Sequence, residues 1–210
     1  MKLYNANLSP NALRVRAVLF ELGLEAEIID VDLRTGENKA DAFLALNPNA
    51  KVPVLDDDGF VLWESRAING YLASKRPERG LYPAEPKARA VVDQWSYWQA
   101  IHLGPAMQRV AFERYMKGRF GRGGPDEAVV KTEMANVTQF LGVLDGALAG
   151  KEWVAGALSI ADFAIATTFQ YRAQADISLA ATPQVERWIA QLEARPSWQK
   201  AIAPIKAAMG

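Results

Sequence analysis

The strongest constraint in this sequence is a single change of pattern about eighty residues from the first residue. Before it, short strand-like segments alternate with helical segments, and after it every regular segment has helical spacing. The change falls at residues 77–86, a stretch that contains three prolines and one glycine. We therefore predict an α/β domain over residues 1–77, a linker over residues 78–86 and an all-helical domain over residues 87–210.

The first half combines strand signals with helix signals. Ser9 followed by Pro10 is typical of a helix start, and Gly23 is typical of its end. The run Asp56-Asp57-Asp58-Gly59 between two apolar segments predicts a hairpin. Strands are expected at residues 2–5, 27–31, 52–55 and 60–63, and helices at residues 9–23, 40–46 and 65–76. This order predicts a mixed sheet covered by helices.

In the second half, one helical face is defined by residues spaced 4, 3, 4 and 3 apart: Val91, Trp95, Trp98, His102 and Pro105. Pro105 lacks an amide N–H and Gly104 loosens the same turn, so the helix is expected to bend there. We expect His102 to be packed and hydrogen-bonded in the core. Further helices are expected at residues 130–148, 159–175, 182–195 and 196–206, with a loop at residues 118–125.

Composition excludes several classes of function. The 24 basic side chains balance the 24 acidic ones, so no net field attracts nucleic acid or an anionic membrane. The absence of cysteine excludes disulfides, cysteine-ligated metals and a protein thiol nucleophile. His102 is the only histidine, so we expect no metal site. No apolar run resembles a signal peptide or a membrane span, so we expect a cytoplasmic protein.

Four motifs could carry function, and each has an ordinary structural explanation when it is taken alone. Ser9-Pro10 is a helix cap followed by a first-turn proline, and Val52-Pro53 is typical of an edge strand. Glu64-Ser65 fits a helix N-terminus, where acidic residues and serine are both favoured. Ser159-Ile160-Ala161-Asp162 is a capping box with aspartate in place of glutamate, and we assign it a role in folding only.

Taken together in this order and spacing, these motifs make the chain similar to the cytosolic glutathione transferases over essentially its whole length. The chain most resembles the serine-type theta and phi classes and their bacterial relatives. Four segments carry the resemblance: Ser9-Pro10-Asn11, Asn47-Pro48-Asn49-Ala50-Lys51-Val52-Pro53-Val54-Leu55, Glu64-Ser65-Arg66-Ala67-Ile68 and Ser159-Ile160-Ala161-Asp162-Phe163. The resemblance implies a thioredoxin-like, glutathione-binding first domain and an all-α second domain that contributes the acceptor pocket.

The resemblance also implies how the glutathione site is built. In the serine-type classes, the residue at the position of Ser9 donates its hydroxyl to the glutathione sulfur. The Val52 backbone, before a cis bond to Pro53, pairs with the cysteinyl residue like an added strand. Ser65 and the helix amides take the α-carboxylate of the γ-glutamyl group, and Glu64 accepts the neighbouring ammonium.

Further residues are placed by the same resemblance. The glycine carboxylate of glutathione is reached by Lys39 and Lys51, beside Asn38, where many relatives have a histidine; asparagine still donates a hydrogen bond but adds no charge. The acceptor pocket is expected to be lined by Asn7, Leu8, Met107, Gln108, Ala111 and Phe112. Tyr4 is the competing catalytic hydroxyl, because other classes use a tyrosine near the end of the first strand.

These implications describe a glutathione S-transferase that activates the thiol for attack on a small hydrophobic electrophile. The resemblance implies a homodimer, with no cofactor beyond glutathione as co-substrate. Two alternatives stay open. One is a non-catalytic glutathione-binding or scaffolding module, and the other is a related glutathione-dependent dehalogenase, peroxidase or ether-cleaving enzyme.

Overall fold

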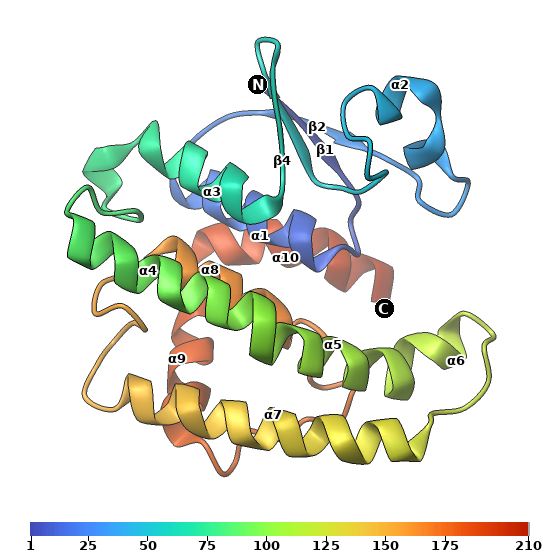
Figure 1. The fold of residues 1–210 in the computed structure, drawn as a ribbon, viewed down its shortest axis with the longest axis vertical. Helices are drawn as coiled ribbons and strands as arrows, with labels where there is room; N and C mark the ends of the chain where they lie inside the picture. Colours follow the sequence, from blue (N-terminus) through green and yellow to red (C-terminus); the bar gives the residue numbers. More distant parts are fainter. Residues whose placement is uncertain (210) are drawn as a thin grey trace. The chain divides into compact units, whose positions relative to one another are not determined.

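The computed structural model describes residues 1–209, which form two compact units. The first unit combines residues 1–82 with the chain from Ala194 onward, and the second unit is residues 83–193. The last helix, α10 (Pro196–Met209), therefore groups with the sheet, although chain order placed it in the helical domain. The reason is packing, because α10 lies along α1 (Pro10–Glu21) and buries Trp198, Ala201 and Ile205 (Figure 1).

The first unit contains the predicted mixed sheet, with strand order β2-β1-β3-β4. Its strands are β1 (Lys2–Asn5), β2 (Glu27–Asp30), β3 (Val54–Asp57) and β4 (Phe60–Trp63). Strand β1 is parallel to β2 and antiparallel to β3, which is antiparallel to β4. The β3–β4 connection is the two residues Asp58 and Gly59, whose φ angles of 53° and 92° suit a tight hairpin.

Helices cover both faces of this sheet. Helix α1 packs against α3 (Ser65–Ser74), and the chain between β2 and β3 forms η1 (Glu37–Lys39) and α2 (Asp41–Leu44). Successive residues of β1 point to opposite faces: Asn5 bonds to Arg16 of α1, whereas Tyr4 packs on Phe43 of α2. The short η2 (Pro77–Arg79) follows α3. Helices α1 and α2 therefore lie on opposite faces of the sheet.

The second unit is built from helices, as predicted. They are α4 (Pro86–Trp98), η3 (Gln99–Leu103), α5 (Gly104–Ala111), η4 (Phe112–Met116), α6 (Lys117–Arg119), α7 (Glu127–Leu148), α8 (Ile160–Ala166), η5 (Thr167–Phe169) and α9 (Pro183–Glu193). Helix α8 is shorter than predicted, because it ends at Ala166 and continues only as the single 3₁₀ turn η5. Within residues 1–209, no helix has both the length and the apolar character that crossing a membrane requires.

The buried stripe of α4 and η3 differs from the predicted one by a single residue. Its members are Val92, Ser96, Gln99 and Leu103. Ser96 tolerates burial because its hydroxyl donates to the Val92 carbonyl oxygen at 2.9 Å. The prediction of a packed core histidine is therefore wrong: His102 is exposed, with its ring centroid 5.4 Å from that of Phe140. The spacing of hydrophobic residues predicted the wrong face of this helix, because the face that is actually buried contains two polar residues, Ser96 and Gln99.

The π-helical turn η3 lies directly before Gly104 and Pro105, where α5 begins, and the bend predicted there stays a prediction. A Cβ atom at Gly104 would lie 2.6 Å from the Gln99 carbonyl oxygen, so a side chain does not fit at this position. Pro105 lies in the first turn of α5, where a missing N–H is best tolerated.

Helix α8 begins at the predicted capping box. Asp162 Oδ2 accepts hydrogen bonds from the Ser159 amide at 2.9 Å and from the Ser159 hydroxyl at 3.0 Å. Asp162 Oδ1 accepts two more, from the Val154 amide and from Trp188 Nε1, each at 3.0 Å. Burial raises the pKa of Asp162, and these four bonds oppose that rise. Asp162 thus holds three segments of the second unit together.

Candidate functional site

Ser9 is the N-cap of α1, as predicted. Its backbone is extended, and its Oγ accepts a hydrogen bond from the Ala12 amide at 3.3 Å. The Ser9 amide donates to the Ala6 carbonyl oxygen at 3.0 Å, which closes the turn between β1 and α1. Because a hydroxyl accepts through a lone pair, its proton remains available to another acceptor. The half-buried Ser9 side chain can therefore cap the helix and donate to a ligand at once.

Tyr4, the competing hydroxyl, belongs to a different part of the first unit. Its ring packs edge-on against Phe43, with 6.1 Å between the ring centroids. Both rings lie in an apolar cluster with Ala6, Val31, Val52 and Val54. This packing fixes the Tyr4 ring against α2, whereas Ser9 caps α1.

Glu64 and Ser65 lie where β4 turns into α3. Glu64 has a φ of 71° and a ψ of 107°, a conformation that costs a residue with a Cβ atom about 1–3 kcal/mol. Its side chain is exposed, whereas Ser65 is buried. The side chain of Glu64, the N-cap residue of α3, makes no capping hydrogen bond, in contrast to the N-cap side chains of α1, α4 and α7. The turn therefore presents an exposed carboxylate beside uncapped helix amides, an arrangement suited to a zwitterion.

Arg14 links this turn to α1. Its Nη1 donates to Asn11 Oδ1 and to Ser65 Oγ, both at 2.7 Å. Burial and the nearby Arg66 lower the pKa of Arg14 to about 9, and Glu64 opposes that change. The guanidinium is therefore charged at neutral pH and places positive potential beside the Ser65 hydroxyl.

Asn38 joins the two segments that carry the predicted lysines. Asn38 Nδ2 donates to the Ala50 carbonyl oxygen at 2.7 Å, which ties η1 to the chain before β3. Lys39 lies on one side of this bond and Lys51 on the other, both with exposed side chains. At least part of the Asn38 amide group is therefore used within the fold. The Val52-Pro53 peptide bond that follows is cis, as the resemblance implies.

The residues predicted to line the acceptor pocket fall in both units. Asn7 and Leu8 belong to the first unit, and the other four belong to the second. Met107 and Ala111 are buried, Gln108 is exposed and Phe112 is half-buried. The Asn7 side chain is used within its own unit, because its Nδ2 donates to Asp30 Oδ2 at 3.1 Å. The acceptor assignment stays a prediction.

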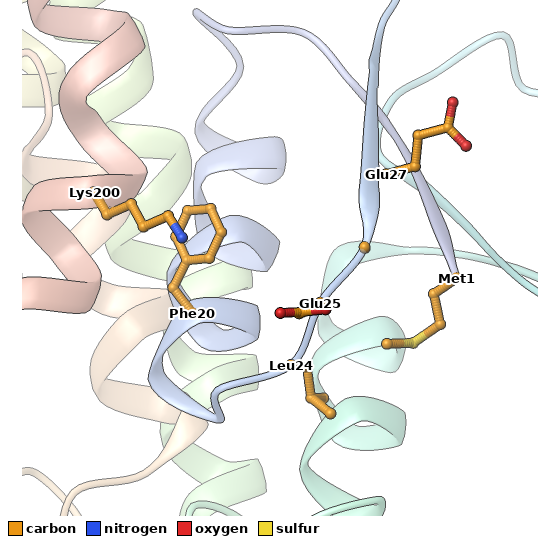
Figure 2. Close-up of a pocket in the computed structure, with 7 residues that line it drawn as sticks. Met1, Phe20, Leu24, Glu25, Glu27 and Lys200 are labelled. Atoms are coloured by element: carbon orange, nitrogen blue, oxygen red, sulfur yellow. The ribbon is translucent and has the colours of Figure 1, made fainter.

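A pocket of about 440 Å³ opens near the other end of α1. It is lined by Met1, Phe20, Leu24, Glu25, Ala26, Glu27 and Lys200, none of which is a predicted site residue (Figure 2). Lys200 Nζ lies 4.2 Å from the centroid of the Phe20 ring. A helix rises 1.5 Å per residue, so Phe20 lies roughly 16 Å along α1 from Ser9. The pocket is therefore separate from the candidate site.

Sequence reasoning passed over two contacts at the site. Ser65 accepts from Arg14, and a second buried arginine, Arg16, donates to Asn5. A signal for both was available, because Arg14 and Arg16 interrupt the apolar run between Leu13 and Leu19. A charged residue inside such a run is buried only when hydrogen bonds compensate it.

Comparisons with known proteins find similarity over almost the whole chain. Two family models match: "Glutathione S-transferase, N-terminal domain" at residues 1–74 and "Glutathione S-transferase, C-terminal domain" at residues 103–196. The chain is 39% identical to glutathione S-transferase 3 of Zea mays, over 98% of this chain and 94% of that protein. It is 33% identical to glutathione S-transferase D7 of Drosophila melanogaster, over 95% of this chain and 88% of that protein.

Solved structures extend the similarity to the whole fold. A structure of glutathione S-transferase-I bound with lactoylglutathione has a TM-score of 0.89 and 32% identity, covering 97% of this chain and 98% of that one. Glutathione S-transferase I from mais, in complex with an atrazine glutathione conjugate, has a TM-score of 0.90 and 32% identity. The match covers 98% of this chain and 97% of that one.

Proposed function

The chain belongs to the glutathione S-transferase family, and from that premise we propose that Ser9 activates the glutathione thiol for attack on small hydrophobic electrophiles. The observation that carries the proposal is the hydrogen bonding of the Ser9 hydroxyl. Its oxygen caps α1 as an acceptor, so its proton can donate a hydrogen bond to the glutathione sulfur. An ordinary thiol with a pKa near 8.5 is only about 3% ionised at pH 7. Activation therefore requires stabilisation of the thiolate.

The magnitudes support Ser9 in this role. Lowering a thiol pKa by about two units requires roughly 2.7 kcal/mol. A hydrogen bond to a charged acceptor contributes about 1.5–3 kcal/mol, and a helix N-terminus about 0.3–1 kcal/mol. Pro10 has no N–H, so the helix acts on the sulfur through its later amides and its dipole. The hydroxyl and the helix together meet the requirement.

The γ-glutamyl end of glutathione is proposed to bind at the start of α3. Ser65 Oγ accepts from Arg14, which leaves the Ser65 proton to donate to the α-carboxylate beside the uncapped amides. Exposed Glu64 accepts from the neighbouring ammonium. At the other end, Lys39 and Lys51 attract the glycine carboxylate. The Val52 backbone, before Pro53, pairs with the cysteinyl residue.

The proposed reaction is nucleophilic transfer. The thiol proton leaves for solvent and the thiolate forms a carbon–sulfur bond. In a substitution the leaving group departs with the electrons of its bond, and in an addition the electrophile takes up a proton from solvent. Ser9 stabilises the sulfur before and during attack. We propose no cofactor beyond glutathione itself.

We further propose that the protein acts as a cytoplasmic homodimer with a detoxifying role. Dimerisation is supported by aromatic side chains outside the buried stripe of α4 and η3. Trp98 and His102 contact Phe140 of α7, and Val143, one turn further along α7, is 47% exposed. We propose that these side chains form part of the interface between the two subunits.

The proposed function is tested with a panel of electrophiles assayed with and without glutathione. The panel contains an aryl halide, an isothiocyanate, a haloacid and an organic hydroperoxide. Glutathione-dependent conjugation of any member supports the proposal. Reduction of the hydroperoxide alone favours a peroxidase, and hydrolytic halide release with glutathione recovered unchanged favours a dehalogenase. Glutathione binding without turnover of any member contradicts catalysis and favours a binding module.

A further inference from the structure

We propose that Arg16 is a positioning residue for Ser9, which fastens the turn that presents the Ser9 hydroxyl and ties that turn to α10. The inference rests on the proposed role of Ser9 and adds the group that holds Ser9 in place. Arg16 touches neither the proposed thiol nor any residue assigned to glutathione.

The Arg16 guanidinium, which is buried, donates in three directions. Nη1 donates to Asn5 Oδ1 at the end of β1, and Nη2 donates to the Asn7 carbonyl oxygen at 3.4 Å. Nε and Nη2 both donate to the Ala201 carbonyl oxygen of α10, at 3.2 Å and 3.0 Å. A planar fork of donors thus joins a strand, the turn before Ser9 and the C-terminal helix.

Arg16 reaches the turn by two routes. The direct route is its bond to the Asn7 carbonyl, the longest of the set. The second route passes through Asn5, whose Nδ2 donates to Asn7 Oδ1 at 3.0 Å. Because Ser9 follows Asn7 by two residues and its amide bonds back to Ala6, a displaced Asn7 also displaces Ser9.

The charge of Arg16 favours a single arrangement of Asn5, Asn7 and α10. The Asn5 amide group stands between opposite charges: its oxygen accepts from Arg16 and its nitrogen donates to Asp30. Burial lowers the pKa of Arg16 to about 10, and the charge of Asp30 opposes that change. The buried cation is satisfied only while Asn5, Asn7 and α10 keep their places, since a shift leaves a charged donor without its acceptor.

The chain offers a matched control in Arg195. Arg195 also fastens the C-terminal segment to α1, through Nε and Nη2 bonds to the Glu21 carboxylate. Glu21 is the last residue of α1, at the opposite end from Ser9. A loss of stability that comes merely from loosening α10 is therefore expected from Arg195→Gln as well as from Arg16→Gln.

The experiment compares the parent protein with Arg16→Gln, Arg16→Lys and Arg195→Gln, each well below its own melting temperature. Without ligand, hydrogen exchange of the Ser9 amide should be about tenfold faster in Arg16→Gln and unchanged in Arg195→Gln. With glutathione bound, Arg16→Gln should raise the thiol pKa by about 0.5–1 unit, because the hydroxyl is present but poorly oriented. Glutathione affinity should change less than about twofold, and Arg16→Lys should give intermediate values.

The two readouts separate this inference from the proposed function. Arg16→Gln and Arg195→Gln could lower the melting temperature alike, with no change in the hydrogen exchange of the Ser9 amide or in the thiol pKa. In that case Arg16 merely anchors α10, and the inference is overturned. If Arg16→Gln does not fold, Arg16→Lys supplies both measurements. If the parent itself fails to lower the thiol pKa, the proposed function fails, and Ser9 exchange still decides whether Arg16 holds the turn.

Discussion

The Ser9 hydroxyl caps α1 and, in the proposed function, also donates a hydrogen bond to the thiolate. Ser9→Ala is expected to raise the pKa of the bound thiol by roughly one to two units, because the lost bond favours the thiolate. The rate at neutral pH should fall about 10- to 100-fold, and the loss should shrink as pH rises. Ultraviolet absorbance of the bound thiolate against pH measures the shift.

Two variants control for other effects of that substitution. Ser9→Thr retains a hydroxyl and a capping side chain, so it should retain most of the thiol shift. Tyr4→Phe should change little, because the Tyr4 ring packs against Phe43. The opposite result, a shift with Tyr4→Phe and none with Ser9→Ala, would reduce Ser9 to a helix cap.

At Ser65 we predict a loss of affinity rather than of thiol activation. Ser65→Ala should weaken glutathione binding by about 1–3 kcal/mol, since a charged carboxylate loses a donor. Stability should fall too, because Arg14 loses the acceptor that Ser65 supplies. Titration calorimetry measures the affinity. Ser74→Ala, at the other end of α3, is the control, and equal affinities in both variants would remove Ser65 from the site.

At the scale of elements, the attachment of α10 to α1 should depend on pH. Burial alone would raise the pKa of Glu21, but hydrogen bonds from Arg195 and Ser197 outweigh it, and the pKa lies below its ordinary value of 4.5. Between the folded and unfolded pKa values the unfolded chain holds more protons, so stability rises with pH there. The contribution of Glu21 is complete above about pH 4.5 and is lost as pH falls toward the folded pKa.

Glu21→Gln should therefore lose less stability on acidification than the parent protein does. Urea denaturation at a series of pH values from neutral to acid measures the free energy of unfolding of each. Arg195→Gln should also flatten the profile, because it removes one of the two hydrogen-bonding partners that lower the Glu21 pKa. Parallel profiles for the parent and both variants would show that this contact does not respond to acid.

At the scale of the whole molecule, the proposed homodimer makes a prediction about surface charge. Val143→Lys should raise the dimer dissociation constant at least tenfold, because it places a charge among apolar side chains at the proposed interface. Leu33→Lys, at a similarly exposed position in the first unit, should not. Sedimentation equilibrium measures both. A parent protein that sediments as a single chain, or equal effects of the two variants, would contradict the interface.

The amino-acid sequence by itself determined the features that depend on neighbouring residues. The Ser9 cap, the Asp58-Gly59 hairpin and the Ser159–Asp162 capping box all follow from residues a few positions apart. Their energies come from local hydrogen bonds and backbone preferences, which short motifs record. The resemblance added the cis bond at Pro53, which local reasoning alone would have assigned to an ordinary edge strand.

Tertiary structure alone decided which buried polar groups meet. Ser65 lies 51 residues from Arg14 in the chain, and Ala201 lies 185 residues from Arg16, so no local pattern pairs them. Apolar spacing likewise did not show that Ser96 and Gln99 are buried, so the buried stripe of α4 and η3 lies one residue away from the predicted one and His102 is exposed. A buried polar group is tolerated only where the fold brings it a partner, and periodicity of apolar residues contains no record of that partner.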